Sequence, residues 1–138
     1  MPGPLVCLVG FALWPLVLVG CIGMVRVSLV LTGKKRAHEF PSNQPHGGER
    51  YWRLNRAHLN CCENLPIWGA IILSGTWLHV STWAFFHLPP VLLGARVVQS
   101  TTHIASGSSS AVSFRFAMFL IQLGCLFWLT IEVLRHAL

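Results

Sequence analysis

A cation, an amide and an anion follow one another at helical spacing near the middle of the chain. Arg56, Asn60 and Glu63 stand where a charged, polar stretch runs into a long apolar one. Because an α-helix advances about 100° per residue, the three side chains fall within a stripe about 60° wide. Polar groups at the edge of an apolar slab are costly, so we expect this stripe to have a function.

The composition indicates the kind of element that must carry this stripe. The chain has 138 residues, of which 54% are hydrophobic and only 10% are charged, and its mean hydropathy is +0.60. Soluble domains carry about 25% charged residues, so a globule this small would lack the charge to cover its surface. We therefore expect one all-α integral membrane domain over residues 1–138.

Four apolar segments predict a bundle of four transmembrane helices. The first segment is longer than the ~20 residues that cross a bilayer. A hydrophilic connection over about 32–55, a tight break at Leu88-Pro89-Pro90 and a serine-rich linker over 106–110 separate the segments. The predicted spans are 5–31, 56–86, 90–105 and 112–134.

The distribution of basic residues predicts the orientation of this bundle. Six of the ten Lys and Arg residues lie between positions 34 and 56, in or directly after the first connection, which indicates membrane topology and not nucleic-acid binding. The positive-inside rule places that connection in the cytoplasm and both termini on the other side. The start of the second span, the end of the third and the start of the fourth then meet at one face.

Polar side chains from these three spans can converge at that face. In the third span Arg96, Gln99, Ser100 and His103 recur at i, i+3, i+4 and i+7, which predicts a polar helix face. The arginines at this end exceed the local acidic residues, so we expect a cationic site that suits a ligand with carboxylates. The side chains expected to converge are Arg53, Arg56, Asn60, Glu63, Gln99, His103 and Arg115.

Structural explanations compete with this functional one. An intramembrane Arg96 needs an anion, and a Glu63–Arg96 pair joining the second and third spans would provide it. Metal binding is disfavoured, because His58, Cys61 and Cys62 have no second ligand pair at zinc spacing. A cysteine nucleophile is disfavoured as well, since no base is indicated. The five cysteines suggest reduced, packed thiols.

The pattern resembles the MAPEG family, the membrane-associated proteins of eicosanoid and glutathione metabolism. The central motif is Arg-x-x-x-Asn-x-x-Glu-x-x-Pro at the start of the second span, here Arg56 to Pro66. Arg96 in the third span and Arg115-x-x-x-Phe119 in the fourth also fit. So does the basic segment 34–37 after the first span.

The resemblance implies a homotrimer that binds glutathione between adjacent subunits. By position, Arg56 and Asn60 would hold the tripeptide and Glu63 its amine, with Arg53, Gln99 and His103 nearby. Arg115 would correspond to the catalytic arginine that lowers the pKa of the glutathione thiol. The thiolate would then attack an electrophilic or peroxidised lipophile from the bilayer.

Two departures from the family pattern concern catalysis. The family usually carries tyrosines in the third span where Gln99 and His103 stand here, and a bulky aromatic residue where Asn64 stands. The leading hypothesis is a membrane glutathione transferase or peroxidase, because the stripe on the second span and Arg115 are present. The lost tyrosines favour the alternative, a lipid-binding scaffold without catalysis. A small transporter subunit is a third possibility, but no span carries paired broken-helix signals.

Overall fold

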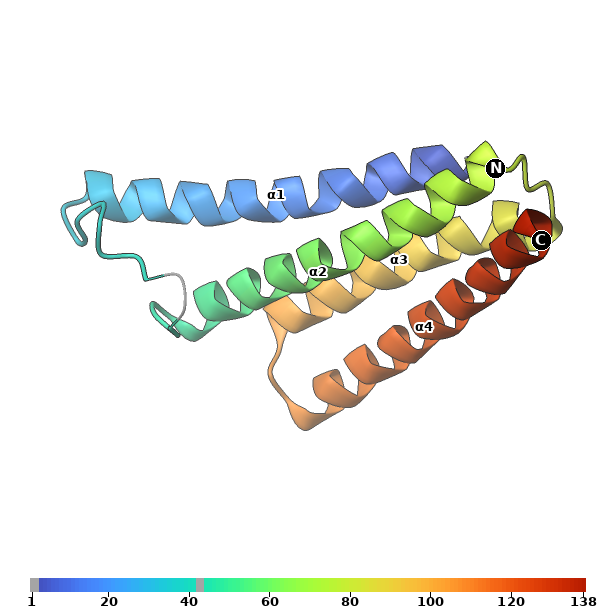
Figure 1. Ribbon diagram of the computed structural model, residues 1–138. Coiled ribbons are helices and arrows are strands. Elements are labelled where there is room, and N and C mark those ends of the chain that lie inside the picture. Colours follow the sequence, from blue (N-terminus) through green and yellow to red (C-terminus); the bar gives the residue numbers. More distant parts are fainter. Residues whose placement is uncertain (1–2, 42–43) are drawn as a thin grey trace.

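The fold consists of four helices in sequence, with no strand in the described part of the chain. The structure is a computed structural model and describes residues 3–41 and 44–138; residues 1, 2, 42 and 43 of the predicted domain lie outside the described residues. The helices run up and down, so that both termini lie at one end (Figure 1). They are α1 (Pro4–Leu31), α2 (Glu49–Trp77), α3 (Trp83–Ala105) and α4 (Ser109–Ala137). The predicted all-α four-helix architecture is confirmed.

Two of the helices are long and apolar enough to cross a membrane. α1 has 28 residues with a peak mean hydropathy of 2.6, and α4 has 29 residues with a peak of 1.9. Both exceed the ~20 residues that span a bilayer. Large aliphatic side chains on α1 are exposed, among them Val9 at 67% and Leu16 at 63%. This outward apolar surface suits lipid or another protein chain better than water.

The core runs through all four helices. Phe11 of α1 and Trp68 of α2 are fully buried, and their ring centroids lie 4.5 Å apart. Leu92 of α3 and Leu129 of α4 belong to the same buried cluster. α1 packs mainly along α2, and α3 mainly along α4. This packing fixes the rotation of each helix and thereby decides which polar side chains face inward.

The break between α2 and α3 lies earlier in the chain than predicted. α2 ends at Trp77 and α3 begins at Trp83, so the predicted span 56–86 crosses the turn, and Pro89 and Pro90 lie inside α3. The turn forms because His79 adopts a φ of 53° and the Thr82 hydroxyl accepts a hydrogen bond from the Phe85 amide at 3.3 Å.

Burial allows the helix to continue through the two prolines. Each proline removes one backbone hydrogen bond to the residue four positions earlier, which is a substantial cost inside a helix. The buried side chains of Phe85 and Pro89 offset this cost. The predicted bounds of α1 and α4 agree with the structure to within three residues, and α1 likewise continues through its internal Pro15, which is buried.

Tight packing of α2 against side chains of α3 and α4 predicts a strong effect at Gly75. A methyl group at Gly75 would overlap the Phe85 ring and lie 3.1 Å from Val133 Cγ2. Overpacking of this kind costs about 1–3 kcal/mol. We expect Gly75→Ala to lower the unfolding free energy by at least about 1 kcal/mol, measured by titrating the purified protein with a denaturing detergent.

Gly69 of the same helix provides the matched control. A methyl group there would meet nothing within 4 Å. Because alanine favours helix over glycine by up to about 1 kcal/mol, Gly69→Ala should be neutral or stabilising. Equal destabilisation by the two substitutions would contradict a specific overlap at Gly75.

Candidate functional site

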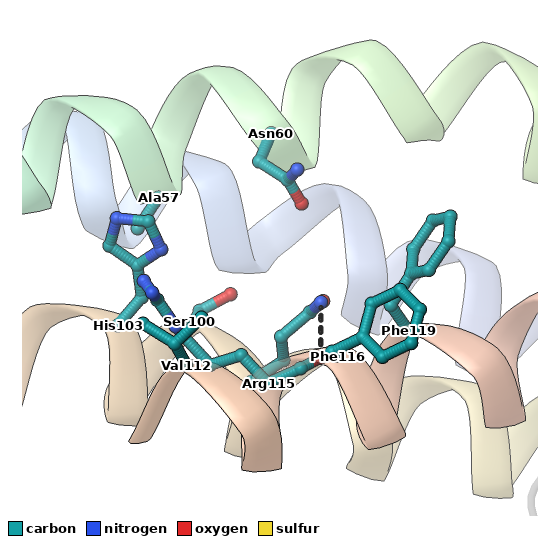
Figure 2. A pocket seen from close by; sticks show the side chains of 9 residues that line it. Ala57, Asn60, Ser100, His103, Val112, Arg115, Phe116 and Phe119 are labelled. Carbon is teal, nitrogen blue, oxygen red and sulfur yellow. Dashed lines mark hydrogen bonds between the residues drawn. The ribbon is translucent and has the colours of Figure 1, made fainter. Parts of the chain in front are cut away.

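A cavity of about 280 Å³ lies between α2, α3 and α4, toward the end that carries the α3–α4 linker. Figure 2 shows the side chains that line it, with Asn60 projecting from α2 toward the side chains of α3 and α4. Its lining residues are Ala57, Asn60, Gln99, Ser100, His103, Val112, Arg115, Phe116 and Phe119. Polar groups and two phenylalanine rings thus share one cavity.

The cavity brings together four of the seven predicted site residues. These are Asn60, Gln99, His103 and Arg115. Gln99 and His103 are one helical turn apart on α3, so both reach the same space. Arg115 lies on the second turn of α4, which packs along α3. The helical periodicity of α3 therefore correctly predicted that Gln99 and His103 face the same space, and their role in binding a ligand stays a prediction.

Arg115 is the cation inside the cavity. Its side chain is half-buried, and its Nε atom is buried without a hydrogen-bond partner among the described residues. No carboxylate pairs with it in the part of the chain that the structure describes. An arginine stays charged in proteins, so the cavity contains a positive charge that a bound anion would neutralise.

His103 lies close to three arginines. Arg115, Arg56 and Arg53 are near enough for their positive charges to act on its imidazole. The four residues come from α2, α3 and α4, so the predicted cationic region does form at one end of the bundle. This arrangement favours anionic ligands over cationic ones.

Gln99 is held by protein partners at both ends of its amide. Its Nε2 donates to the Arg115 carbonyl oxygen at 3.1 Å, drawn as the dashed line in Figure 2. Its Oε1 accepts from Gln122 Nε2 at 3.2 Å, and Gln122 also donates to the Met118 carbonyl oxygen at 2.9 Å. Gln99 thus fixes the backbone of α4 at Arg115, and less of its hydrogen-bonding capacity remains for a ligand.

Gln122 was not among the predicted site residues. It is 1% exposed and its Oε1 has no partner among the described residues. A signal was present in the sequence, since an amide in the middle of an otherwise apolar helix is costly and marks a partner or a site. Gln122 lies seven residues after Arg115, which places both on one face of α4.

The predicted Glu63–Arg96 ion pair is wrong. Arg96 is 1% exposed and donates from Nη1 to Asn60 Oδ1, while its guanidinium lies 5.7 Å from the Phe11 ring centre. Glu63 is exposed and is not in an ion pair in the described part of the chain. The reason is angular: Asn60 and Glu63 are about 60° apart around α2, and α3 lies on the Asn60 side.

Arg53 and Arg56 lie outside the cavity. Arg53 connects α2 to α3, because its Nε donates to the Ile104 carbonyl oxygen at 3.3 Å, and its Nη1 lies 3.3 Å from Glu49 Oε2 in the preceding turn of α2. Arg56, like Glu63, is exposed on α2. The predicted site therefore divides into a cavity within the chain and a charged surface beside it.

The cysteines of α2 lie in different surroundings. Cys61 is fully buried, with its Sγ 3.4 Å from Ser100 Oγ, whereas Cys62 is exposed with its Sγ 3.4 Å from His58 Nε2. Among the described residues, no group of three or more His, Cys, Asp or Glu side chains is arranged to hold a metal ion. Neither cysteine lines the cavity that contains Arg115.

Comparison with known proteins identifies the family to which the chain belongs. No curated protein matches the sequence. The model of the MAPEG family matches residues 4–135, which is nearly the full length of the chain. Members of this family are membrane proteins that act as glutathione transferases, peroxidases or related proteins. Together with the two apolar helices, this match shows a membrane protein that belongs to the MAPEG family.

Proposed function

We propose that this protein is a membrane-bound glutathione transferase or peroxidase that acts on a lipophilic electrophile. The observation that carries the proposal is the Arg115 guanidinium, whose buried Nε has no partner among the described residues, in a cavity shared with Asn60 and His103. Phe116 and Phe119 give the same cavity an apolar wall. A thiolate and a hydrophobic molecule could both be accommodated there.

Arg115 would act by stabilising the thiolate of glutathione. A nearby cation favours the ionised sulfur, and arginine keeps its charge at any physiological pH. In a transferase step the sulfur forms a thioether bond to the electrophilic carbon, and the leaving group departs with its electron pair. In a peroxidase step the thiolate attacks a peroxide oxygen and the O–O bond breaks, which gives a sulfenic acid on glutathione and an alkoxide that takes up a proton to leave as the alcohol. The thiol of a second glutathione then attacks the sulfenic sulfur, which forms the disulfide and releases water.

The remaining predicted residues would hold the rest of the tripeptide. Arg53 and Arg56 offer cations to its carboxylates, and Glu63 offers an anion to its amine. Arg56 and Glu63 are exposed on the single chain, so we propose a homotrimer in which a neighbouring subunit covers them. Residues 1–138 would form one domain whose four helices all span the membrane, with the connection 32–55 in the cytoplasm.

Isothermal titration with glutathione tests the binding part of this proposal. The protein is purified in a mild detergent, and its oligomeric state is checked in the same sample. We expect saturable binding at or below millimolar glutathione and much weaker binding of S-methylglutathione, which cannot form a thiolate. An intact trimer that shows no heat of binding at millimolar glutathione would contradict the proposal.

A non-catalytic lipid-binding scaffold is the second candidate. It is favoured by one observation: Gln99 occupies a position where the family usually has tyrosine, and its amide is engaged by Gln122 and the Arg115 backbone. A scaffold would keep the cavity and its apolar wall without turnover. An assay for conjugation of glutathione separates the two candidates.

A further inference from the structure

A second polar cavity lies on the other side of α2, in the space between α1 and α2. It has a volume of about 210 Å³ and shares no lining residue with the cavity around Arg115. Figure 1 shows α1 and α2 separating toward the end of the bundle where the connection between them lies. The cavity occupies this wedge, so it opens near one face of the proposed membrane.

The lining changes from apolar to polar along the wedge. Val19 and Ile22 of α1 and Leu59 of α2 line its inner part. Further toward the connection, α1 contributes Arg26 and α2 contributes Trp52. Because α1 and α2 are antiparallel, the apolar residues of both helices lie at the inner end of the cavity and the polar residues lie at the end near the connection. Such a cavity suits an amphiphile with an apolar chain and a polar head.

The charge at the polar end is positive. Arg26 is half-buried, its Nε donates to the Tyr51 hydroxyl at 2.7 Å, and its guanidinium carbon lies 5.3 Å from the centre of the Phe40 ring. Lys35 lies 5.5 Å from the same ring. No carboxylate pairs with Arg26 in the described part of the chain. The Tyr51 hydroxyl holds the guanidinium in place but does not neutralise it.

Other hydrogen-bonding side chains surround this cation. His46, Asn55 and His58 complete the polar part of the lining. His46 contacts the Gln44 carbonyl oxygen through Nδ1, while its Nε2 is buried without a partner among the described residues. Asn55 donates to the Tyr51 carbonyl oxygen at 2.8 Å, which leaves its side-chain oxygen available. A ligand with several oxygen atoms could meet these groups.

We propose that the wedge between α1 and α2 binds the phosphate headgroup of an anionic membrane lipid, with Arg26 as the main contact. Charge-assisted hydrogen bonds from arginine to phosphate are among the strongest polar contacts in proteins. The headgroup lies beside Arg26, and the first part of an acyl chain lies against Val19, Ile22 and Leu59. The site is independent of glutathione and of Arg115.

Native mass spectrometry of the full-length protein in detergent tests this proposal. The probes are phosphatidylglycerol and phosphatidylcholine with identical acyl chains, and inorganic phosphate. We expect the protein to bind phosphatidylglycerol roughly tenfold more tightly than phosphatidylcholine. Arg26→Gln should abolish this preference, whereas Arg36→Gln, which removes an exposed charge near the same end, should retain it.

Two further measurements complete the test. Val19→Trp fills the apolar part of the cavity without changing charge, so it should weaken binding of both lipids and is informative even if Arg26→Gln fails to fold. Millimolar inorganic phosphate should not displace phosphatidylglycerol. Equal binding of the two lipids, equal loss of preference in the Arg36 variant, unchanged binding in the Val19 variant, or full displacement by phosphate would each overturn the proposal.

Discussion

Replacing Arg115 with alanine should lower the rate of glutathione conjugation by roughly 100- to 1,000-fold, the usual cost of removing one group that stabilises developing or buried negative charge. Arg115 is the only arginine that lines the cavity between α2, α3 and α4, as far as the described residues show. The substitution removes the cation beside the sulfur but leaves the backbone contact from Gln99 to the Arg115 carbonyl intact. The fold should therefore survive.

The measurement is the conjugation of an aryl halide by the purified protein, with kcat and KM determined separately. Loss of thiolate stabilisation should lower kcat more than it raises the KM for glutathione. The ultraviolet absorbance of bound thiolate should also fall. Arg135→Ala, which removes an exposed arginine from the last turn of α4, is the matched control and should retain activity.

The same assay decides between enzyme and scaffold. A wild-type protein that binds glutathione without turnover would support the scaffold. Turnover that is unchanged in the Arg115 variant would show that the thiolate forms elsewhere. Turnover that is lost in Arg115→Ala but kept in Arg135→Ala would exclude the scaffold.

Replacing Asn60 with leucine should destabilise the protein by about 3 kcal/mol, because it removes a partner from a buried charge. Arg96 is 1% exposed and donates to Asn60 Oδ1, and its Nε already has no partner among the described residues. Leucine at position 60 can accept no hydrogen bond. The unfolding free energy from a denaturing-detergent titration measures the loss.

A double variant separates the structural role of Asn60 from its proposed role in binding glutathione. Asn60→Leu combined with Arg96→Met removes the buried guanidinium together with the amide that it contacts, so no buried charge is left without a partner. Stability should therefore recover in the double variant, while glutathione affinity should stay low if Asn60 touches the ligand. Recovery of both quantities would show that Asn60 acts only through Arg96.

Asn64→Leu controls for the chemical change itself. Asn64 lies one turn further along α2, and its amide donates only to the Asn60 carbonyl oxygen, at 2.7 Å. Loss of this local contact should change stability by less than about 1 kcal/mol. A loss as large as that of Asn60→Leu would contradict a special role for the Arg96 contact.

The bounds of a helix were predictable where one continuous apolar segment forms it. α1 and α4 are continuous apolar segments, and their bounds agree with the sequence prediction to within three residues. The end of α2 was not predictable from local rules, because two prolines normally mark a break. Here the Thr82 cap and the burial of the Phe85 ring stabilise a helix that continues through both prolines. That burial depends on contacts with other helices, which local sequence does not reveal.

The site was predictable to the level of helix faces. Spacing correctly placed Gln99 and His103 on one face of α3, and topology correctly placed that face beside Arg115. Residue spacing alone could not predict whether Asn60 or Glu63 contacts Arg96. The two side chains are only about 60° apart around the axis of α2, and the rotation of that helix determines which of them faces α3. It also could not show that Gln122 engages Gln99, because such pairing depends on the rotation of α4.

The position of the two prolines inside α3 determines where in a membrane the missing helical hydrogen bonds would lie. Pro89 and Pro90 lack amide hydrogens, so the carbonyl groups of Phe85 and Phe86 lose their helical donors. Measured through both prolines, the 23 residues of α3 are roughly 34 Å long, which is enough for the ~30 Å of an average hydrocarbon core. If α3 spans the bilayer as proposed, the two carbonyl groups without helical donors would lie in its first turn. They would then be close to the membrane surface, where water and lipid headgroups can donate hydrogen bonds to them, and not in the middle of the hydrocarbon.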